Sequence, residues 1–267
     1  MRSAQGSGGV VNPVQITSQR GVMTATLADV ESRNALGPEL VEGLREAVAA
    51  AGADPTVRAL VVTNTGTTFC AGANLKQRSG SSQRGPRSGG FEELLHEIQT
   101  SPTPIVGRIA GHVVGGGNGL AAALDISIAA DHVKFGFSEV RLGVAPAIIS
   151  VVCLPKMRPG EAMEAFLRGH RFSASRAAEL GLINRAVPAD QLDAAVEEVL
   201  ADLRKGGPRA LGFAKRLVHE VPRMTTKDAF QWATALSNQL FAGDEAREGM
   251  AAFLQKRDPA WVKSDGD

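Results

Sequence analysis

Hydrophobic residues along the first half of the chain form short continuous runs that alternate with helix-spaced patterns. The pattern predicts strands over 14–17, 22–27, 57–63 and 105–110, and an amphipathic helix over 38–51. Pro38 stands at the first turn of that helix, where its missing N–H is not needed. The continuous run at 57–63 is typical of a strand in a parallel sheet that is covered on both faces. This order of elements predicts an α/β architecture.

From Arg158 onward the spacing of apolar residues becomes helical. The pattern predicts helices over 159–168, 173–180, 190–204, 208–219 and, with interruptions, 226–256, with one short strand over 182–187. A Gly-, Ser- and Arg-rich segment over 77–90 is expected to be a surface loop before a helix near 91–100. We therefore expect a flexible N-terminus (1–12), an α/β core (13–200) and a helical C-terminal region (201–267) that docks on its own core or on a neighbouring subunit.

A glycine-rich turn follows the apolar run at 105–110. Four glycines stand within the five residues 115–119, and apolar residues then continue as a buried helix would. Glycines let backbone N–H groups approach a ligand closely, and the start of a helix adds the positive end of its dipole. Such a turn can hold an anion or a developing oxyanion. A Walker A loop does not fit, because Gly116 is followed by Gly117 and Asn118 and not by Lys and Ser or Thr. A G-x-G-x-x-G turn does not fit either, because Leu120 occupies the position of its last glycine.

A second small-residue turn, 71–76, follows the strand predicted over 57–63. It reads Ala71-Gly72-Ala73-Asn74-Leu75-Lys76. Two turns with free backbone amides, brought together by one sheet, would supply the two donors of an oxyanion hole. Each well-placed donor is typically worth ~10²–10³ in rate.

Composition narrows the class of protein further. The 267 residues carry 29 Lys+Arg against 28 Asp+Glu, which gives no basic surface for nucleic acid. No apolar run approaches the ~20 residues of a membrane helix, and the first dozen residues lack a signal-peptide core. Cys70 and Cys153 are the only cysteines, which favours a reducing, cytoplasmic location. Five scattered histidines show no metal-ligand spacing, and none lies near Cys70 to activate it, so we expect no metal and no cysteine nucleophile.

The two turns together resemble the signature of the enoyl-CoA hydratase/isomerase (crotonase) family. The resemblance extends over most of the chain, through the segments 32–36, 125–130, 137–143, 177–183 and 248–253. Gly119, together with the segment 138–150, is closest in pattern to the bacterial methylglutaconyl-CoA hydratase branch.

This resemblance implies a crotonase-like spiral of strand–strand–helix (ββα) units with a helical C-terminal region for trimerisation, as a homotrimer or a dimer of trimers. It implies an acyl-CoA thioester as substrate, whose oxygen lies between the amides of Ala73 and Gly116. Coenzyme A is part of that substrate, so no separate cofactor is expected. The residues that the resemblance places along the CoA thioester, besides those two, are Arg33, Ala35, Ala71, Asn74, Leu75 and Lys76.

The chain departs from the family pattern at one catalytic position. Hydratases of the mitochondrial type use two glutamates, and here Gly119 stands at the first position and Glu139 at the second. Glu139 lies between Phe137 and Val140, where desolvation would raise its pKa toward a useful acid/base value.

Three functions remain open on the sequence. The first is hydration of a 2-enoyl-CoA, branched or carboxylated like methylglutaconyl-CoA, with Glu139 as sole protein acid/base. The second is isomerisation of a 3-enoyl-CoA to a 2-enoyl-CoA, which needs one carboxylate. The third is acyl-CoA binding without turnover, which the retention of Glu139 disfavours.

Overall fold

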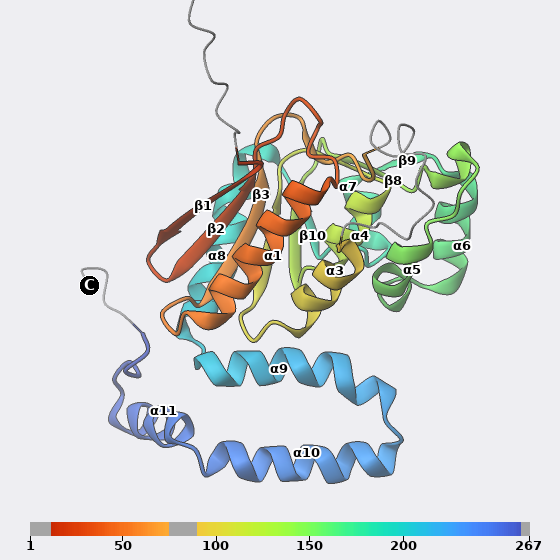
Figure 1. Cartoon of the computed structure of the whole chain (residues 1–267). Coiled ribbons are helices and arrows are strands. Elements are labelled where there is room, and N and C mark those ends of the chain that lie inside the picture. The colour runs from red at the N-terminus through yellow and green to blue at the C-terminus, as the bar shows by residue number, and fades with distance from the viewer. Residues whose placement is uncertain (1–11, 75–89, 263–267) are drawn as a thin grey trace, which may run out of the picture.

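Two sheets organise the core of the protein (Figure 1). The computed structural model describes residues 12–74 and 90–262. The larger sheet has the strand order β1-β2-β3-β5-β7-β10, in which β1 is antiparallel to β2 and the other neighbours are parallel. Its strands are β1 (Val14–Gln19), β2 (Val22–Leu27), β3 (Ala59–Asn64), β5 (Ile105–Ile109), β7 (Ile126–Ala130) and β10 (Arg185–Val187).

The smaller sheet has the order β4-β6-β8-β9, with β4, β6 and β8 parallel and β9 antiparallel to β8. These strands are β4 (Thr68–Cys70), β6 (His112–Val114), β8 (Lys134–Gly136) and β9 (Arg171–Ser173). Each has three residues, too few to show a hydrophobic period, so the sequence pattern missed all four. In particular, the turn at 115–119 follows β6 and not the strand predicted over 105–110.

A repeated strand–strand–helix unit connects the two sheets. The units are β3-β4-α3, β5-β6-α4 and β7-β8-α5, and in each the first strand joins the larger sheet and the second the smaller. The helices are α3 (Phe91–Thr100), α4 (Gly116–Ala123) and α5 (Ala147–Cys153), the last preceded by a 3-10 turn, η1 (Glu139–Leu142). The expected spiral of ββα units is thus confirmed.

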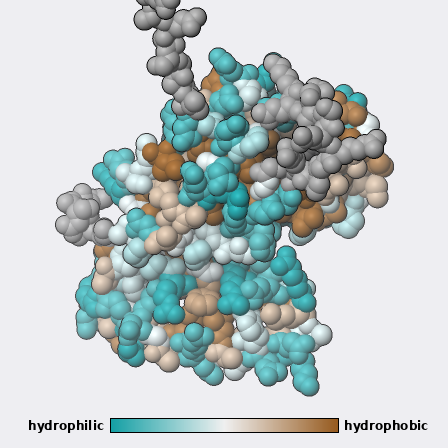
Figure 2. Space-filling view, viewed as in Figure 1, coloured by the Kyte–Doolittle hydropathy of each residue, from teal (hydrophilic) through white to brown (hydrophobic). Residues whose placement is uncertain are grey.

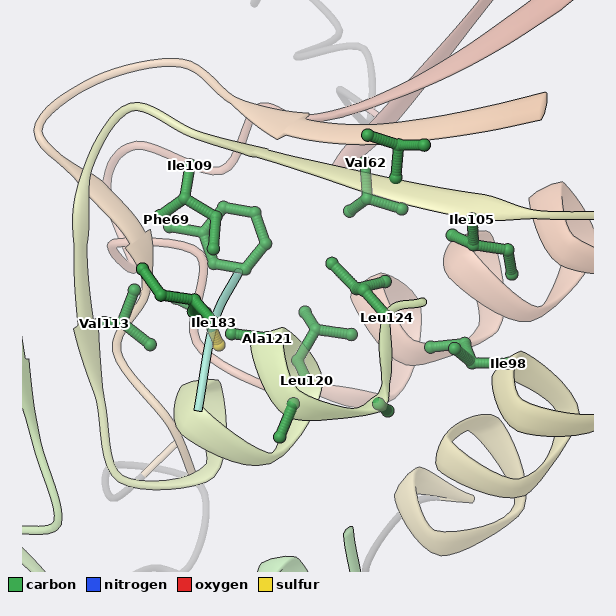
Figure 3. Close-up of a cluster of buried hydrophobic side chains, with 14 of the residues drawn as sticks. Val62, Phe69, Ile98, Ile105, Ile109, Val113, Leu120, Ala121, Leu124 and Ile183 are labelled. Carbon is green, nitrogen blue, oxygen red and sulfur yellow. The ribbon is translucent and has the colours of Figure 1, made fainter. Parts of the chain in front are cut away.

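Helices cover both faces of the larger sheet. Figure 1 shows α1 (Pro38–Ala53) in front of the sheet and α8 (Leu192–Lys205) behind it, and every residue of β3 is buried, as its apolar run indicated. Figure 3 shows side chains of β3, β5, α4 and the residue that caps α4 meeting in this core: Val62, Ile105, Ile109, Leu120 and, as the cap, Leu124. Burial of each such side chain contributes roughly 1.5–3 kcal/mol, which makes α4 an integral part of the core.

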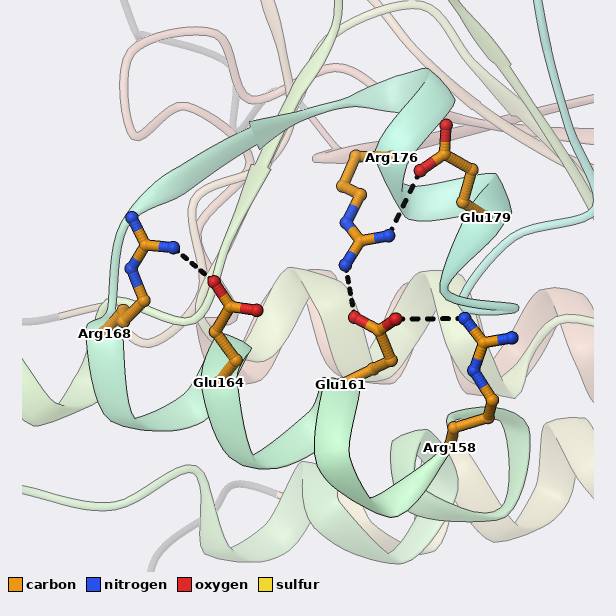
Figure 4. Close-up of polar contacts among 6 residues, drawn as sticks. All are labelled: Arg158, Glu161, Glu164, Arg168, Arg176 and Glu179. Atoms are coloured by element: carbon orange, nitrogen blue, oxygen red, sulfur yellow. Dashed lines mark hydrogen bonds and ion pairs between the residues drawn. The ribbon is translucent and has the colours of Figure 1, made fainter.

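The region after α5 forms a second helical layer beside the smaller sheet. It contains η2 (Leu154–Lys156), α6 (Pro159–Arg168) and α7 (Ala174–Glu179). Figure 4 shows Arg176 of α7 paired with both Glu161 of α6 and Glu179, while Glu161 also accepts from Arg158 at 3.0 Å. Single exposed ion pairs are worth only ~0–1 kcal/mol, but this shared carboxylate links α7 to α6.

The C-terminal helices form an arm that extends from the core (Figure 1). Following the 3-10 turn η3 (Ala189–Gln191) and α8, the arm comprises α9 (Pro208–Glu220), η4 (Val221–Arg223), α10 (Thr226–Phe241) and α11 (Asp244–Gln255). The boundary expected between residues 200 and 201 falls inside α8. Because Leu192, Val196 and Leu200 of α8 are buried in the core, α8 belongs to the core and the arm begins with α9 at Pro208. None of the described helices is long and apolar enough to cross a membrane.

A buried ion pair attaches α9 to the core. Lys215 Nζ lies 2.8 Å from Asp125 Oδ2 and donates to the carbonyl of Ile98 at 2.6 Å. The same Asp125 oxygen accepts the backbone N–H of Ile105, at the start of β5. Because the Lys215 side chain is only 7% exposed, loss of either partner would leave an uncompensated buried charge.

Helix α5 packs on α4 at Gly119. A Cβ at this position would overlap Ile149 Cγ2 and lie 2.7 Å from Ile149 Cβ. Both residues are buried. The approach of the two helices therefore depends on residue 119 having no side chain.

We predict that Gly119→Ala lowers the free energy of unfolding by about 1–3 kcal/mol, because the added methyl overpacks this contact. The cost should be smaller in an Ile149→Ala background, where Cγ2 is absent. Urea unfolding of the four proteins of this cycle measures the coupling. Gly160→Ala in α6 is the matched control, since a Cβ there meets nothing within 4 Å. An equal cost of Gly119→Ala in both backgrounds would contradict the overlap.

Candidate active site

Three turns meet at one edge of the smaller sheet. They follow β4, β6 and β8, which are parallel neighbours, so their carboxyl ends lie at the same edge. These turns carry Ala73, Gly116 and Glu139 respectively. The topology therefore gathers the three residues that the sequence placed at the reacting thioester.

The first turn is held by the loop before α1. Ala71 N–H donates to the Arg33 carbonyl at 3.1 Å, and Leu36 N–H donates to the Gly72 carbonyl at 2.8 Å. Leu36 and Ala73 also form an isolated parallel bridge. Asn34, wholly buried beneath this loop, donates from Nδ2 to the Thr68 carbonyl at 2.8 Å. This bonding fixes the turn in place.

The first and second turns touch through their backbones. Gly72 has φ +81°, and a Cβ there would lie 2.8 Å from the Val114 carbonyl oxygen and 2.9 Å from Gly116 N. A Cβ at Gly117 would lie 2.5 Å from the Cys70 carbonyl oxygen. Side chains at these positions would force the turns apart. The turn motif by itself indicates no role for Gly72, which stands between two alanines.

Two backbone amides are free at this contact. Within residues 12–74 and 90–262, neither Ala73 N–H nor Gly116 N–H donates to another backbone group. Gly116 is the first residue of α4, so its N–H is among those that a helix leaves unpaired. The positive end of the α4 dipole lies at the same point. These amides can donate to an oxygen that gains negative charge.

The Glu139 carboxyl group lies beside the second turn. Its Oε1 is 3.5 Å from the point that a Cβ on Gly115 would occupy. Burial raises the pKa of this carboxyl above its ordinary value of 4.5, as the flanking Phe137 and Val140 predicted. Its Oε2 is buried and has no hydrogen-bond partner among the described residues. A half-buried carboxyl group with a free oxygen can accept and return a proton.

The other sequence-predicted residues fall into three groups. Arg33, Ala35, Ala71 and Asn74 lie on the two bonded segments just described, with the Arg33 side chain exposed and Ala35 buried. Leu75 and Lys76 lie outside the described residues, as does most of the segment 77–90. Cys70 is buried and its pKa is raised to about 12, so the thiol is not an available nucleophile.

The described residues of the three turns contain a single carboxylate, Glu139. At the position where the family pattern has another, Gly119 lies in the first turns of α4, and Ile149 of α5 fills the space next to it. A glutamate at 119 would need α5 to move. The packing of α5 on α4 therefore leaves no space for a second carboxylate at position 119.

Comparisons with known proteins find relatives that cover most of the chain. A Thermus thermophilus protein that carries an enoyl-CoA hydratase name is 32% identical over 243 residues, covering 89% of this chain and 96% of that protein. The crotonyl-CoA hydratase of Syntrophomonas wolfei is 29% identical over 231 residues, covering 85% of this chain and 89% of that protein.

Solved structures show the same fold. An enoyl-CoA hydratase of Mycobacterium smegmatis superposes with a TM-score of 0.88 at 27% identity, covering 94% of this chain and 99% of that one. Pseudomonas aeruginosa AtuE superposes with a TM-score of 0.87 at 32% identity, covering 94% of this chain and 100% of that one. The family model for enoyl-CoA hydratase/isomerase matches residues 17–264. This chain belongs to the enoyl-CoA hydratase/isomerase family.

Proposed function

We propose that the protein hydrates a 2-enoyl-CoA, with Glu139 as its sole protein acid/base. The observation that carries the proposal is the position of the Glu139 carboxyl group beside a turn whose Gly116 amide, together with that of Ala73, is free. These amides would donate to the thioester oxygen. The CoA moiety would run along Arg33, Ala35, Ala71 and Asn74, and along Leu75 and Lys76 beyond them.

The chemistry follows from this arrangement. Two donors at the thioester oxygen draw electron density from the conjugated double bond and make the β-carbon electrophilic. Ionised Glu139 takes one proton from water as the hydroxyl group adds to the β-carbon, and the resulting enolate is held by the two amides. Protonated Glu139 then returns a proton to the α-carbon, so one molecule of water is added. One carboxyl group thus acts first as base and then as acid.

The apolar packing at position 119 supports a branched or carboxylated substrate resembling methylglutaconyl-CoA. Mitochondrial-type hydratases orient the water with two carboxylates, whereas the described turns here provide one. A carboxylate on the substrate would supply a second polar group for that water.

The single carboxylate also favours a second candidate, isomerisation of a 3-enoyl-CoA to a 2-enoyl-CoA. In that reaction Glu139 would remove a proton from the α-carbon and return it to the γ-carbon. No water needs to be placed, so one carboxyl group is sufficient. The same two amides would hold the dienolate.

Turnover of three CoA thioesters by wild type and Glu139→Gln tests these proposals. We expect wild type to hydrate a branched, carboxylated 2-enoyl-CoA faster than crotonyl-CoA, and Glu139→Gln to lose ~10²–10⁴ in rate while retaining acyl-CoA binding. A 3-enoyl-CoA in deuterated water separates the isomerase, since only an isomerase moves the double bond. Binding without turnover of any thioester would refute both enzymatic proposals, and an unaffected Glu139→Gln would refute the role of Glu139.

We predict an acid limb in the pH profile of kcat/KM with its midpoint above 4.5. Burial raises the pKa of Glu139, and the reaction begins with the ionised form. Activity should therefore rise with pH through the raised pKa and fall as pH is lowered through it. The residual rate of Glu139→Gln should lack this limb. Constant wild-type activity down to pH 4.5, with circular dichroism showing folded protein, would contradict it.

We also propose that copies of the chain assemble through the arm as a trimer or a dimer of trimers. Only Leu236 of α10 and Ala252 of α11 are buried, whereas large apolar side chains of the arm are exposed, among them Phe230, Phe241, Phe253 and Leu254. Figure 2 shows apolar surface on the arm framed by hydrophilic residues. A second exposed apolar set lies over 142–167, and contact between two different surfaces can close a ring.

Sedimentation of the full chain should give the mass of three or six subunits. Phe253→Glu should shift that distribution toward monomer because Phe253 is 83% exposed in the single chain and its burial would need an apolar partner. Lys227→Glu, an exposed position on α10, is the control and should leave assembly unchanged. A monomeric wild type at micromolar concentration would contradict the proposal.

A further inference from the structure

Asn118 is a wholly buried polar residue to which the family resemblance assigns no role. It lies in the first turn of α4, two residues after Gly116. Its Nδ2 donates to two backbone carbonyls, those of Gly115 at 3.0 Å and Gly136 at 2.9 Å. Both acceptors belong to the edge where the three turns meet.

The bond to Gly115 controls the direction of the neighbouring amide. Gly115 has φ 53° and ψ −124°, the values of the first central residue in a type II′ turn. The peptide between Gly115 and Gly116 is planar and trans, so its C=O and N–H point in opposite directions. Asn118 holds that C=O with Nδ2 and, at 2.9 Å, with its own backbone N–H. The Gly116 N–H is therefore directed away from Asn118.

The bond to Gly136 ties the same peptide to the strand that leads to Glu139. The Gly136 carbonyl also accepts the Gly115 N–H at 2.9 Å, so it receives two donors from the second turn. Gly136 is the last residue of β8, and η1 begins at Glu139. A single side-chain amide thus joins the free donor of one turn to the end of the strand that carries the carboxyl group.

We propose that Asn118 is a positioning residue: it orients the Gly115–Gly116 peptide so that the Gly116 amide donates to the carbonyl oxygen of a bound acyl-CoA thioester. The inference rests on the proposed function for the identity of the ligand. Beyond that function, Asn118 would control how strongly the thioester carbonyl is polarised, although its buried side chain touches neither the substrate nor the reacting atoms.

Two substitutions separate this role from packing. Asn118→Ala removes both side-chain bonds. Asn118→Ser removes the bond to Gly136 but places a hydroxyl group where it can donate to the carbonyl three residues earlier, that of Gly115. Ser127→Ala is the matched control, because buried Ser127 likewise donates to a carbonyl of α4, that of Ala121 at 2.8 Å, remote from the turn.

Two readouts are measured on each folded variant. The first is kcat and KM for the 2-enoyl-CoA that wild type hydrates best. The second is the absorption maximum of a CoA thioester of a conjugated aryl-enoic acid bound at saturation, which moves to longer wavelength when its carbonyl is polarised. A loss of packing alone would lower the melting temperature without changing this wavelength.

We expect Asn118→Ala to lower kcat by ~10- to 100-fold, less than complete loss of an oxyanion donor, with KM within about threefold of wild type. The wavelength shift should shrink in Asn118→Ala and recover in part, with kcat, in Asn118→Ser. Ser127→Ala should leave kcat and the shift unchanged. If Asn118→Ala does not fold, a wild-type-like shift or an absent shift in Asn118→Ser would each overturn the inference, since a partial shift is required.

Other outcomes are equally decisive. Wild-type kcat and shift in Asn118→Ala, or equal losses in Asn118→Ala and Asn118→Ser, would overturn the role of the Gly115 bond. Equal loss in Ser127→Ala would show a packing effect only. If wild type bound the probe with the full shift but hydrated no enoyl-CoA, the proposed function would fail while the shift in the variants still tested Asn118. A wild-type complex without any shift would overturn the inference itself.

Discussion

The arrangement at this edge depends on the close approach of two backbones, one in the turn after β4 and the other in the turn after β6. Gly72 lies against Val114 and Gly116, and Gly117 lies against the Cys70 carbonyl, at separations that leave no space for a Cβ. Because these contacts join parallel neighbours of one sheet, the turns share an edge, and so do the two amides that donate to no backbone group within the described residues. Preorganised donors of this kind stabilise developing charge without having to reorganise during the reaction.

The proposed acid/base chemistry relies on one carboxyl group, that of Glu139, where the two-glutamate pattern has two. Glu139 is desolvated, which raises its pKa, and Ile149 of α5 packs over Gly119 in α4. The helix that supplies the Gly116 amide thus gains apolar contact where it lacks a carboxylate. A mechanism with one carboxyl group places more of the catalytic demand on polarisation of the thioester carbonyl, and hence on the direction of the Gly115–Gly116 peptide.

The arm is organised differently from the core. Lys215 and Asp125 form a buried ion pair that attaches α9 to the core, and loss of either partner would leave the other charge buried without compensation. Beyond α9, helices α10 and α11 bury one residue each within the described chain and expose large apolar side chains. Their amphipathic patterns are therefore satisfied only in part by this chain, which is the basis for the proposed assembly.

The amino-acid pattern by itself predicted the α/β class, a glycine-rich turn at the start of a buried helix, and strands of the larger sheet at β1, β2, β3, β5 and β10 but not at β7. It also predicted the α-helices with approximate bounds, except α5. Through a resemblance carried by local motifs, it also indicated Ala73, Gly116 and Glu139 as candidate site residues, and the structure places their turns at one edge of the smaller sheet. These features are encoded in runs of neighbouring residues, which a sequence displays directly. The four short strands, the backbone contact at Gly72, the overlap of Ile149 with position 119 and the two bonds of Asn118 emerged only in the tertiary structure. Each joins residues distant in the chain or sets a peptide orientation through a side chain, and no local pattern encodes such contacts.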